Sequence, residues 1–470
     1  MACIVFGIAD SLSHYNASFK IAKELKRDGH RVVFIGDSNK RSKDVEAQGF
    51  KFQLIYNKYF EKAKEIDSIY DTGFIIWSYF KKLINQIKWL REYKDEVLSG
   101  REIKKIIEKY HPDLFIIDIF HVFHYPTIYR FGIETIILQT YVNTRKGRNV
   151  PPLNSNYIPR TGWKSAVYTE LLWCRLFIIR YVLNLWNKIM YFGLDKLTLF
   201  KMSARKNNLP LHKIDFLRSF HWGLKNIPEL ILAAKEFDFE HPSAKNQYYV
   251  GPAVEFQRKE ILYDERYLEV CLEREIQEVN DRSIVRPIIY CSLGTLNTDW
   301  YKSCSEFFEK VIEAFYELKN YELYLSVGPD INVNSFSNVP GHVHIFNLVP
   351  QIDVLEKASL MITHGGINSI NECIFAGVPM IVYPLSSNID QNGNAARVLH
   401  HQLGIRGDIE SENKQGIQQR ILHMMDSPVY KNNTDKMKSV YKDYEGKNLF
   451  MSIINRCLEK SEKIYGTENV

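Results

Sequence analysis

Two separate stretches of the chain alternate short apolar strands with amphipathic helices. The first stretch contains the strand-like residues 3–8, 31–37, 113–118 and 134–140. The second contains the strand-like residues 287–295, 321–327, 342–346, 360–363 and 378–384. Repeated units of a strand followed by a helix form a parallel sheet with helices on both faces. The pattern therefore predicts an α/β protein with two facing doubly wound, Rossmann-like domains and a cleft between them.

The length of 470 residues also favours two domains, because single hydrophobic cores rarely grow beyond about 250–300 residues. A polar, highly charged stretch at residues 253–285 separates the two α/β patterns and is the expected linker. We expect an N-terminal domain at residues 1–252 and a C-terminal domain at residues 286–445. Residues 446–470 are predicted to form a C-terminal helix that could cross back to the N-terminal domain.

Composition and cysteine usage exclude several classes of protein. The seven cysteines are scattered and form no CxxC pair, which argues against a disulfide framework and a structural zinc site. The net charge is +6, but basic residues are interleaved with acids, so the basic stripe of a nucleic-acid-binding protein is missing. The N-terminus lacks the basic region of a signal peptide. We therefore expect a cytoplasmic monomer without a nucleic-acid partner.

The most hydrophobic segment, residues 171–192, is interrupted by Arg175, Arg180 and Lys188. These charges argue against a membrane-spanning helix and favour an amphipathic one. Aromatic and aliphatic residues are frequent across residues 163–224, which favours a hydrophobic acceptor pocket. Peripheral contact of residues 163–224 with a membrane surface is an alternative. An amphipathic helix packed on the first domain explains the segment without a membrane, and we favour that explanation.

Residues 363–372 read THGGINSINE and directly follow an apolar, strand-like run. Ligands of parallel α/β sheets bind beyond the carboxyl ends of the strands. Glycines allow the backbone to approach a ligand, and the start of a helix favours an anion such as a phosphate. The same residues also fit a capping box from Ser369 to Glu372, which requires no ligand.

The surrounding run, from about residue 342 to 398, resembles the nucleotide-sugar-binding signature of the inverting GT-B glycosyltransferases. This superfamily includes plant glucosyltransferases, animal UDP-glucuronosyltransferases, and bacterial macrolide and carotenoid glycosyltransferases. The resemblance is carried by LVPQIDVL, THGGINSINE and GVPMIVYPLSSNIDQNGNAARV in order. SLGT at residues 292–295, SHYNASFKIAKELKRDGHRVVFI in the first loop and helix, and YVGP before the linker are also similar to the family. The likeness covers nearly the whole chain and is loosest at residues 50–245.

The resemblance implies a donor site for a nucleotide diphosphate sugar. UDP-sugar is favoured over dTDP-sugar, because Glu372 suits a ribose with both hydroxyls. The donor-binding residues it implies are Ser292, Thr295, Val349, Gln351, His364, Gly366, Asn368, Ser369, Glu372, Asp390 and Gln391. Among these, Glu372 and Gln351 would bind the ribose, Asp390 and Gln391 the sugar, and the backbone of Val349 the base.

Four donor residues are assigned to the diphosphate, namely Thr295, His364, Asn368 and Ser369, with Ser292 nearby, and Gly366 belongs to the same motif. Two positions depart from the family pattern. Leu348 stands where many members have a base-stacking aromatic residue, and Ile367 stands where plant members often have tryptophan.

The resemblance also implies the chemistry. His14 would be the general base that activates a hydroxyl of a hydrophobic small-molecule acceptor, and Asp118 would orient it. Direct displacement would invert the anomeric centre and give a β-glycoside. No metal or cofactor is expected, because the helix start and hydroxyl donors would stabilise the departing diphosphate. EFDFE at residues 236–240 is expected to be solvated surface and not a metal-binding DxD motif.

Three alternatives stay open at this point. A nicotinamide dehydrogenase would explain Asp37 at the end of the second strand, but the first turn, GIADSLSH, lacks GxGxxG. A nucleotide-sugar epimerase of related fold would bind the same donor without an acceptor pocket. A non-catalytic auxiliary partner protein would need no intact donor motif. Five histidines receive no role in this hypothesis: His111, His121, His124, His400 and His401.

Overall fold

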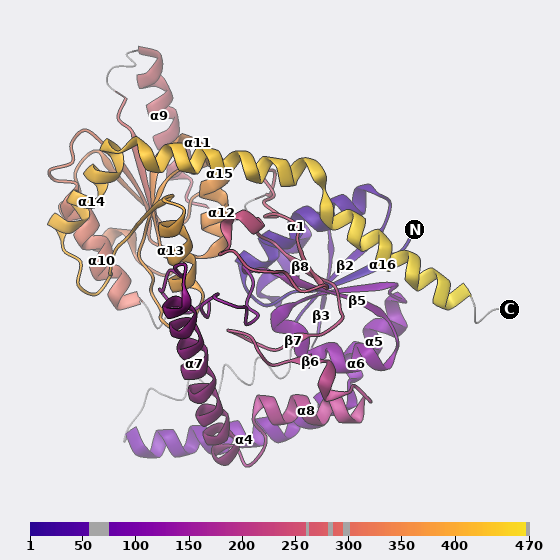
Figure 1. The fold of residues 1–470 in the computed structure, drawn as a ribbon. Helices are drawn as coiled ribbons and strands as arrows, with labels where there is room; N and C mark the ends of the chain where they lie inside the picture. Colours follow the sequence, from indigo (N-terminus) through magenta and orange to yellow (C-terminus); the bar gives the residue numbers. More distant parts are fainter. Residues whose placement is uncertain (56–74, 260–262, 281–284, 295–300, 467–470) are drawn as a thin grey trace.

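Two parallel β-sheets, each covered by helices, form the two halves of the protein (Figure 1). The computed structural model describes residues 1–55, 75–259, 263–280, 285–294 and 301–466. The sheets have seven and six strands in this described part of the chain. The predicted α/β class, with two facing doubly wound domains, is confirmed.

The first sheet has the strand order β3-β2-β1-β4-β5-β8-β9, and all its pairs are parallel. Its strands are β1 (Cys3–Gly7), β2 (Arg31–Gly36), β3 (Lys51–Leu54), β4 (Leu114–Asp118), β5 (Glu134–Gln139), β8 (Glu229–Ile231) and β9 (Gln247–Tyr249). Its helices are α1 (Leu12–Arg27), η1 (Asn39–Arg41), α2 (Ser42–Ala47), α4 (Ile75–Ser99), α5 (Arg101–Tyr110), η3 (Ile119–His124), α6 (Tyr125–Arg130), α7 (Trp163–Met190), α8 (Lys196–Lys206), η4 (Leu211–Lys213) and η5 (Lys235–Phe237). A short antiparallel pair, β6 (Ile214–Asp215) and β7 (Gly223–Leu224), lies beside it.

The second sheet has the strand order β12-β11-β10-β13-β14-β15 and is also parallel throughout. Its strands are β10 (Ile288–Ser292), β11 (Glu322–Ser326), β12 (Val343–Phe346), β13 (Ala358–Thr363), β14 (Met380–Val382) and β15 (Gly404–Arg406). Its helices are α9 (Arg266–Asn280), α10 (Tyr301–Ala314), η8 (Val333–Ser335), α11 (Gln351–Lys357), α12 (Ile367–Ala376), α13 (Gln391–His400), α14 (Lys414–Asp426) and α15 (Pro428–Lys447).

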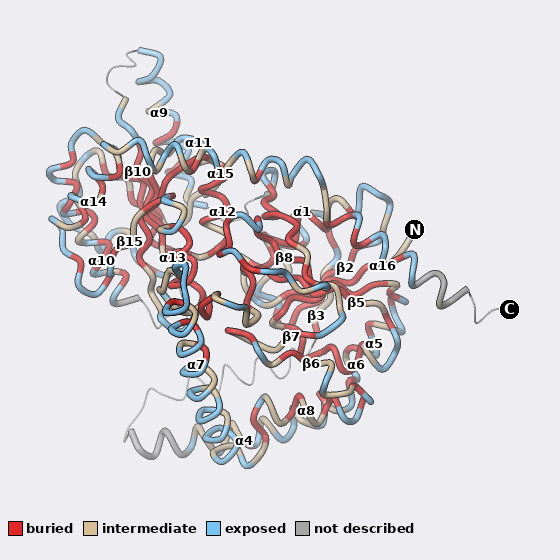
Figure 2. The backbone as a smooth tube through the Cα atoms, viewed as in Figure 1, coloured by how far each residue is buried: buried red, intermediate tan, exposed pale blue. Residues whose placement is uncertain are grey.

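The central strands of both sheets are buried on both faces, as expected for parallel sheets covered by helices. All five residues of β1 and all five of β10 are buried. Figure 2 shows this burial concentrated at the centre of each half, with exposed backbone on the outer helices. The continuous apolar runs of the sequence are explained by this burial.

The last helix, α16 (Leu449–Gly466), lies against the first sheet, although it follows the second sheet in the chain. Phe450 and Ile454 belong to the same hydrophobic cluster as Ile4 and Phe6. Figure 1 shows α15 and α16 running one after the other from one half to the other. Within the predicted linker, α9 packs on the second sheet, where Tyr267 contacts Tyr324 edge-on.

A buried ion pair joins the two halves and contradicts one sequence-based expectation. Asp238, in the predicted surface segment EFDFE, is only 4% exposed. Its Oδ1 accepts bonds from Nε and Nη2 of Arg397 on α13, at 2.8 and 2.6 Å. Tyr249 donates to the other carboxylate oxygen at 2.6 Å. The expectation of solvated surface was wrong for Asp238, because its partner lies in the other half of the chain.

Among the residues that the structure describes, there is no helix long and apolar enough to cross a membrane.

Candidate functional site

A cavity of about 300 Å³ lies between the two halves, at the carboxyl edges of both sheets. His14 contributes to it from the first half. From the second half, ten of the predicted donor residues line it: Ser292, Val349, Gln351, His364, Gly366, Asn368, Ser369, Glu372, Asp390 and Gln391. The eleventh, Thr295, lies outside the described residues.

His14 and Asp118 form a buried pair at this cavity. Nδ1 of His14 lies 2.6 Å from Oδ2 of Asp118. The strands before them, β1 and β4, are neighbours, so their carboxyl ends bring the two side chains together. His14 was expected in a loop, but it lies in the first turn of α1, which already begins at Leu12.

The surroundings of Asp118 keep it ionised. Burial alone would raise the pKa of this fully buried carboxyl, but His14 and the bond from the Phe120 amide hold the pKa below its ordinary value. The Phe120 amide donates to Oδ1 at 2.9 Å, so Asp118 also caps the 3₁₀ helix η3. Each carboxylate oxygen therefore has a separate partner.

The contacts of His14 leave one ring nitrogen for chemistry. The Thr140 hydroxyl lies 3.0 Å from the same Nδ1 that meets Asp118. Phe120 and Tyr141 pack against the imidazole edge-to-face, at 5.0 and 5.7 Å between ring centroids. We assign the proton of the neutral ring to Nδ1, because it lies against a carboxylate. Nε2 is then free to exchange a proton with a group in the cavity.

The start of α12 does not form the capping box that the sequence allowed. The N-cap is Gly366, which has no side chain to accept bonds from the first-turn amides. Ser369 lies inside the helix and accepts a bond from Nε2 of Gln351 at 3.3 Å. The amides of this helix start therefore border the cavity without a side-chain cap, which favours an anionic ligand.

Two glycines make room for His364 beside this helix start. A Cβ on Gly294 or Gly366 would lie only 2.6 or 2.7 Å from the His364 ring. Gly294 also has a φ of +79°, in the left-handed region that favours glycine. Burial lowers the pKa of His364 to about 4, so the ring is neutral near pH 7. Its Nδ1 has no hydrogen-bond partner within the described part of the chain.

Glu372 is held by two residues in the predicted ribose region. Gln351 donates to its Oε2 at 2.6 Å. Arg258 donates to its Oε1 at 2.5 Å and also lines the cavity. Sequence reasoning missed Arg258, because it lies in the expected linker and belongs to no motif.

Asp390 and Gln391 lie at the other end of the cavity. The amides of Leu385 and Ser386 donate to Oε1 of Gln391 at 2.6 and 3.1 Å, which leaves its Nε2 to donate to a ligand. Asn394 donates to Asp390 at 2.6 Å. Burial raises the pKa of Asp390 to about 6, although Asn394 lowers it in part. Asn394, one helical turn after Asp390 in the same motif, was given no role by the sequence reasoning.

The three remaining predicted donor residues of the cavity lie in a loop, at a strand end and at a helix start. Val349 lies between β12 and α11, next to Leu348, and both line the cavity. Ser292 ends β10, and its hydroxyl accepts a bond from the Gly294 amide at 3.3 Å. Asn368 donates to the backbone oxygen of Ser13 at 2.6 Å and so joins the two halves beside His14.

The chain is similar in sequence to known glycosyltransferases. The sequence profile of a family described as UDP-glucoronosyl and UDP-glucosyl transferase matches residues 269–453. NDP-glycosyltransferase YjiC of Bacillus licheniformis is 32% identical over 235 residues, which make up 47% of this chain and 56% of that protein. UDP-glucuronosyltransferase 3A2 of Homo sapiens is 23% identical over 443 residues, which cover 89% of this chain and 77% of that protein.

Solved structures show the same fold over the whole chain. The glycotransferase of kitacinnamycin has a TM-score of 0.61 at 18% identity and covers 97% of this chain and 99% of its own. The glycosyltransferase VinC, in complex with dTDP, has a TM-score of 0.60 at 11% identity and covers 97% of this chain and 100% of its own.

The chain therefore has the fold of the GT-B glycosyltransferases, and its residues 269–453 are similar to the UDP-glucoronosyl and UDP-glucosyl transferase family. The family profile lies in the half that carries the donor residues. The chain spans about half the length of the bacterial curated relatives it matches, 56% of the Bacillus licheniformis protein and 41% of NDP-glycosyltransferase YjiC of Bacillus subtilis.

Proposed function

We propose that the protein transfers a hexose from a nucleotide diphosphate sugar, with UDP-sugar preferred, to a hydroxyl of a hydrophobic small molecule. One observation carries this proposal: the His14–Asp118 pair faces, across one cavity, an uncapped helix start surrounded by ten of the predicted donor residues. The family profile that matches residues 269–453 supports the same activity, as do the glycosyltransferase names of the relatives.

In the proposed reaction, Nε2 of His14 takes the proton of the acceptor hydroxyl. The acceptor oxygen then forms a bond to the anomeric carbon while the bond from that carbon to the diphosphate oxygen breaks. Attack from the side opposite the leaving group converts an α-linked sugar into a β-glycoside. Asp118 holds the ring in the required tautomer and stabilises the imidazolium that forms.

The leaving nucleoside diphosphate carries the negative charge that develops in this step. The first-turn amides of α12, with the side chains of His364, Asn368 and Ser369, would donate to its phosphate oxygens. We propose that this set of neutral donors makes a metal ion unnecessary at the diphosphate. Arg258 also lines the cavity, where its charge is paired with the Glu372 carboxylate.

Glu372 is proposed to accept hydrogen bonds from the two ribose hydroxyls. Glu372→Ala is therefore expected to weaken UDP binding by on the order of 1 to 3 kcal/mol. Deoxyribose lacks the 2′-hydroxyl, so the same substitution should reduce the binding free energy of dTDP by a smaller amount. Calorimetric titration with both nucleotides measures the difference. Glu372→Gln is the matched variant, because it keeps a partner for Arg258. Equal losses for UDP and dTDP would contradict the ribose assignment.

Asp390 is proposed to accept bonds from sugar hydroxyls as a carboxylate. Because its pKa is raised to about 6, protonation should raise the KM for the donor as the pH falls from 7.5 to 5. The Asp390→Asn variant should have a higher KM that no longer changes over this range. An identical pH profile in the two proteins would remove Asp390 from the donor site.

The raised pKa of Asp390 also has a consequence for stability. A folded-state pKa above the unfolded value means that stability falls as the pH rises from about 4 to about 6. At pH 7.5 the ligand-free Asp390→Asn variant should therefore be more stable than the parent, by on the order of 1–3 kcal/mol. Urea denaturation measures this gain.

A UDP-release assay tests the proposed activity directly. Several nucleotide sugars are crossed with a panel of hydrophobic alcohols and phenols, and the products are identified by mass spectrometry. A β-glycoside is the expected product. Conversion of the nucleotide sugar without any acceptor would instead indicate an epimerase. Binding of another enzyme, with no turnover of any donor, would indicate an auxiliary partner.

Helix α7 has an unusual distribution of apolar residues. Its buried side chains are Ser165, Thr169 and Trp173, and Arg180 donates to backbone oxygens of the first half. Large apolar side chains instead point to solvent, and Figure 2 shows most of the helix exposed. Leu183 is also exposed but lies outside the sector that the others share, and these others form the apolar stripe of α7: Trp163, Val167, Tyr168, Leu171, Ile178, Ile179, Tyr181, Val182, Leu185, Trp186 and Ile189. At 3.6 residues per turn, the stripe spans roughly 160° of the helix.

We propose that the apolar stripe of α7 lies on an anionic membrane surface, from which a hydrophobic acceptor could be taken. Lys164 and Arg175 fall within the stripe at helical spacing, whereas the only acid of the helix, Glu170, lies beside it and pairs with Lys146 at 2.6 Å. Exposed tryptophan and tyrosine together with cations suit the headgroup region. The favoured sequence-based explanation, packing on the first domain, holds only for the opposite face of α7.

Liposome flotation measures this contact. The protein should float with phosphatidylcholine vesicles that contain phosphatidylglycerol, and less with phosphatidylcholine alone. Serine substitutions at Ile178, Tyr181 and Trp186 should abolish flotation. The matched control carries serine at Leu268, Leu272 and Ile276, which are similarly exposed on α9. No flotation with anionic vesicles would reject the proposal, and a dimer lost only in the α7 variant would assign the stripe to a second copy.

A further inference from the structure

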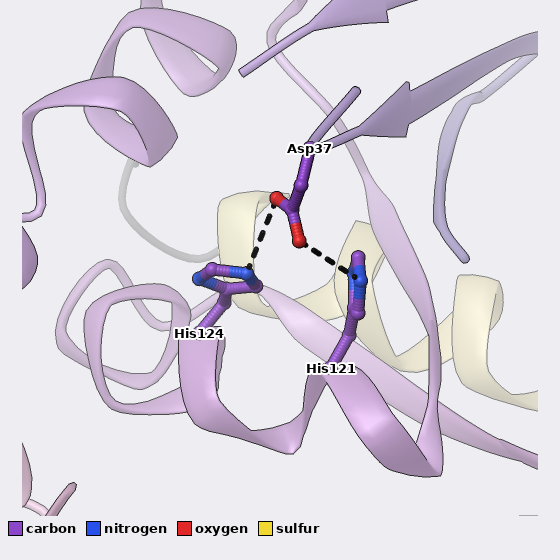
Figure 3. A group of neighbouring side chains, drawn as sticks. All are labelled: Asp37, His121 and His124. Atoms are coloured by element: carbon purple, nitrogen blue, oxygen red, sulfur yellow. Dashed lines mark ion pairs between the residues drawn. The ribbon is translucent and has the colours of Figure 1, made fainter. Parts of the chain in front are cut away.

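A second cluster of ionisable side chains lies at the edge of the first sheet, outside the cavity. It consists of Asp37, His121 and His124, which Figure 3 shows converging from separate elements. Asp37 follows β2, whereas both histidines lie in η3, after β4. Because β2 and β4 flank β1 on opposite sides, the cluster spans three adjacent strands. Both histidine side chains are buried, and the Asp37 side chain is 12% exposed.

The geometry of η3 directs both imidazoles to one side. Residues three apart are eclipsed in a 3₁₀ helix, so His121 and His124 project together. Their ring centroids lie 5.2 Å apart, with the rings nearly perpendicular. Nε2 of His121 lies 3.3 Å from Oδ2 of Asp37, and Nε2 of His124 lies 3.8 Å from Oδ1. Each histidine therefore faces a different carboxylate oxygen.

The carboxylate is incompletely satisfied by these contacts. Oδ1 of Asp37 is buried and has no hydrogen-bond partner within the described part of the chain. Buried carboxylate oxygens are normally paired, and a missing partner calls for an explanation. The 3.8 Å separation to His124 is too long for a hydrogen bond, but it leaves room for an ion that both atoms could contact.

We propose that Asp37, His121 and His124 bind a divalent transition-metal ion, with Zn²⁺ the best fit, at a site separate from sugar transfer. Two imidazoles and one carboxylate are ligands that Zn²⁺ accepts, with water in the fourth position. The three ligand atoms lie within 4.8 Å of one another. A tetrahedral site with bonds of about 2.0–2.2 Å needs separations of roughly 3.3–3.6 Å. Small side-chain rotations close this difference.

The surroundings limit the affinity of this site. Lys196, the first residue of α8, is close enough to act on Asp37 and on both histidines, and its charge opposes a bound cation. Replacing it with methionine removes that charge and keeps much of the apolar stem. Lys196→Met should therefore bind Zn²⁺ more tightly than the parent protein.

A bound ion would act on the fold and not on the reaction. It would tie the loop after β2 to η3, whose N-cap is Asp118, the partner of His14. The ion would thus hold in place the short helix that begins at the His14–Asp118 pair. Metal binding itself does not depend on the proposed sugar transfer. An experiment that contradicts one of these two proposals therefore does not contradict the other.

The experiment uses the full-length protein after dialysis against a chelator. Titration with Zn²⁺ is expected to show one saturable site and a rise in Tm. Asp37→Asn and His121→Gln should each weaken the affinity by more than about tenfold. His111→Gln, at an exposed histidine, should bind as the parent does. X-ray absorption of the Zn²⁺-loaded parent should show nitrogen and oxygen ligands with outer scattering from two imidazoles.

If the variants fail to fold, measurements on the parent protein alone can test whether the metal site exists. Absence of saturable binding of Zn²⁺ or Co²⁺ would overturn the proposal, as would an absorption spectrum without imidazole scattering. Folded Asp37→Asn and His121→Gln proteins with undiminished affinity would place the ion elsewhere and overturn it equally.

Discussion

His14→Ala is expected to lower kcat for sugar transfer by about 10²–10⁴, the usual contribution of a general base. UDP affinity should change little, because the predicted nucleotide-binding side chains come from the other half of the protein. Steady-state kinetics with the best donor and acceptor, together with calorimetric UDP titration, separate these two quantities.

His111→Ala is the matched control for His14, because His111 is an exposed histidine on the same half of the protein. It should keep the parent kcat. Undiminished turnover in His14→Ala would remove His14 from the mechanism. A parallel loss of UDP affinity would instead mean that the substitution disturbs the donor site, for example through the bond from Asn368 to the Ser13 backbone.

Asp118→Asn is expected to lower kcat by a similar factor, up to about 10⁴, with little change in KM. An asparagine amide facing Nδ1 of His14 would donate a hydrogen bond to it, so the ring would carry its own proton on Nε2. In that tautomer Nε2 already carries a proton and cannot take one from the substrate hydroxyl. The substitution keeps an oxygen for the Phe120 amide, so η3 should retain its cap.

Kinetics across the pH range, together with thermal unfolding, distinguish this loss from misfolding. Asp44→Asn, in a surface ion pair with Arg41, is the control and should keep the parent kcat. A folded Asp118→Asn protein with full activity would show that His14 needs no orienting carboxylate.

The order of strands and helices was predictable because burial leaves a local signature. Apolar runs such as residues 3–8 and 113–118 are continuous, since strands of a parallel sheet are buried on both faces. Their carboxyl ends must share one edge of the sheet, which brings His14 and Asp118 within reach of each other. Most of the donor side of the cavity is equally local, because its residues follow strands of the second sheet within a few positions.

Local pattern could not predict which distant side chains would meet. Arg258 reaches Glu372 across 114 positions, and Asp238 meets Arg397 across 159. Asp238 was expected on the surface, because an acid between aromatic residues has the same local pattern whether it is solvated or paired. His121 and His124 received no role, because strand order decides that β2 and β4 flank the same central strand.

The sequence by itself determined the α/β class, the strands that end at the ligand-binding edges, and the motif residues placed there. These features can be predicted because they depend on periodicity and composition over a few neighbouring positions. Only the tertiary structure decided how the two halves face each other, which charges pair between them, and which side of α7 is left in solvent. Those outcomes depend on packing between segments far apart in the chain, where geometry determines which groups are buried together.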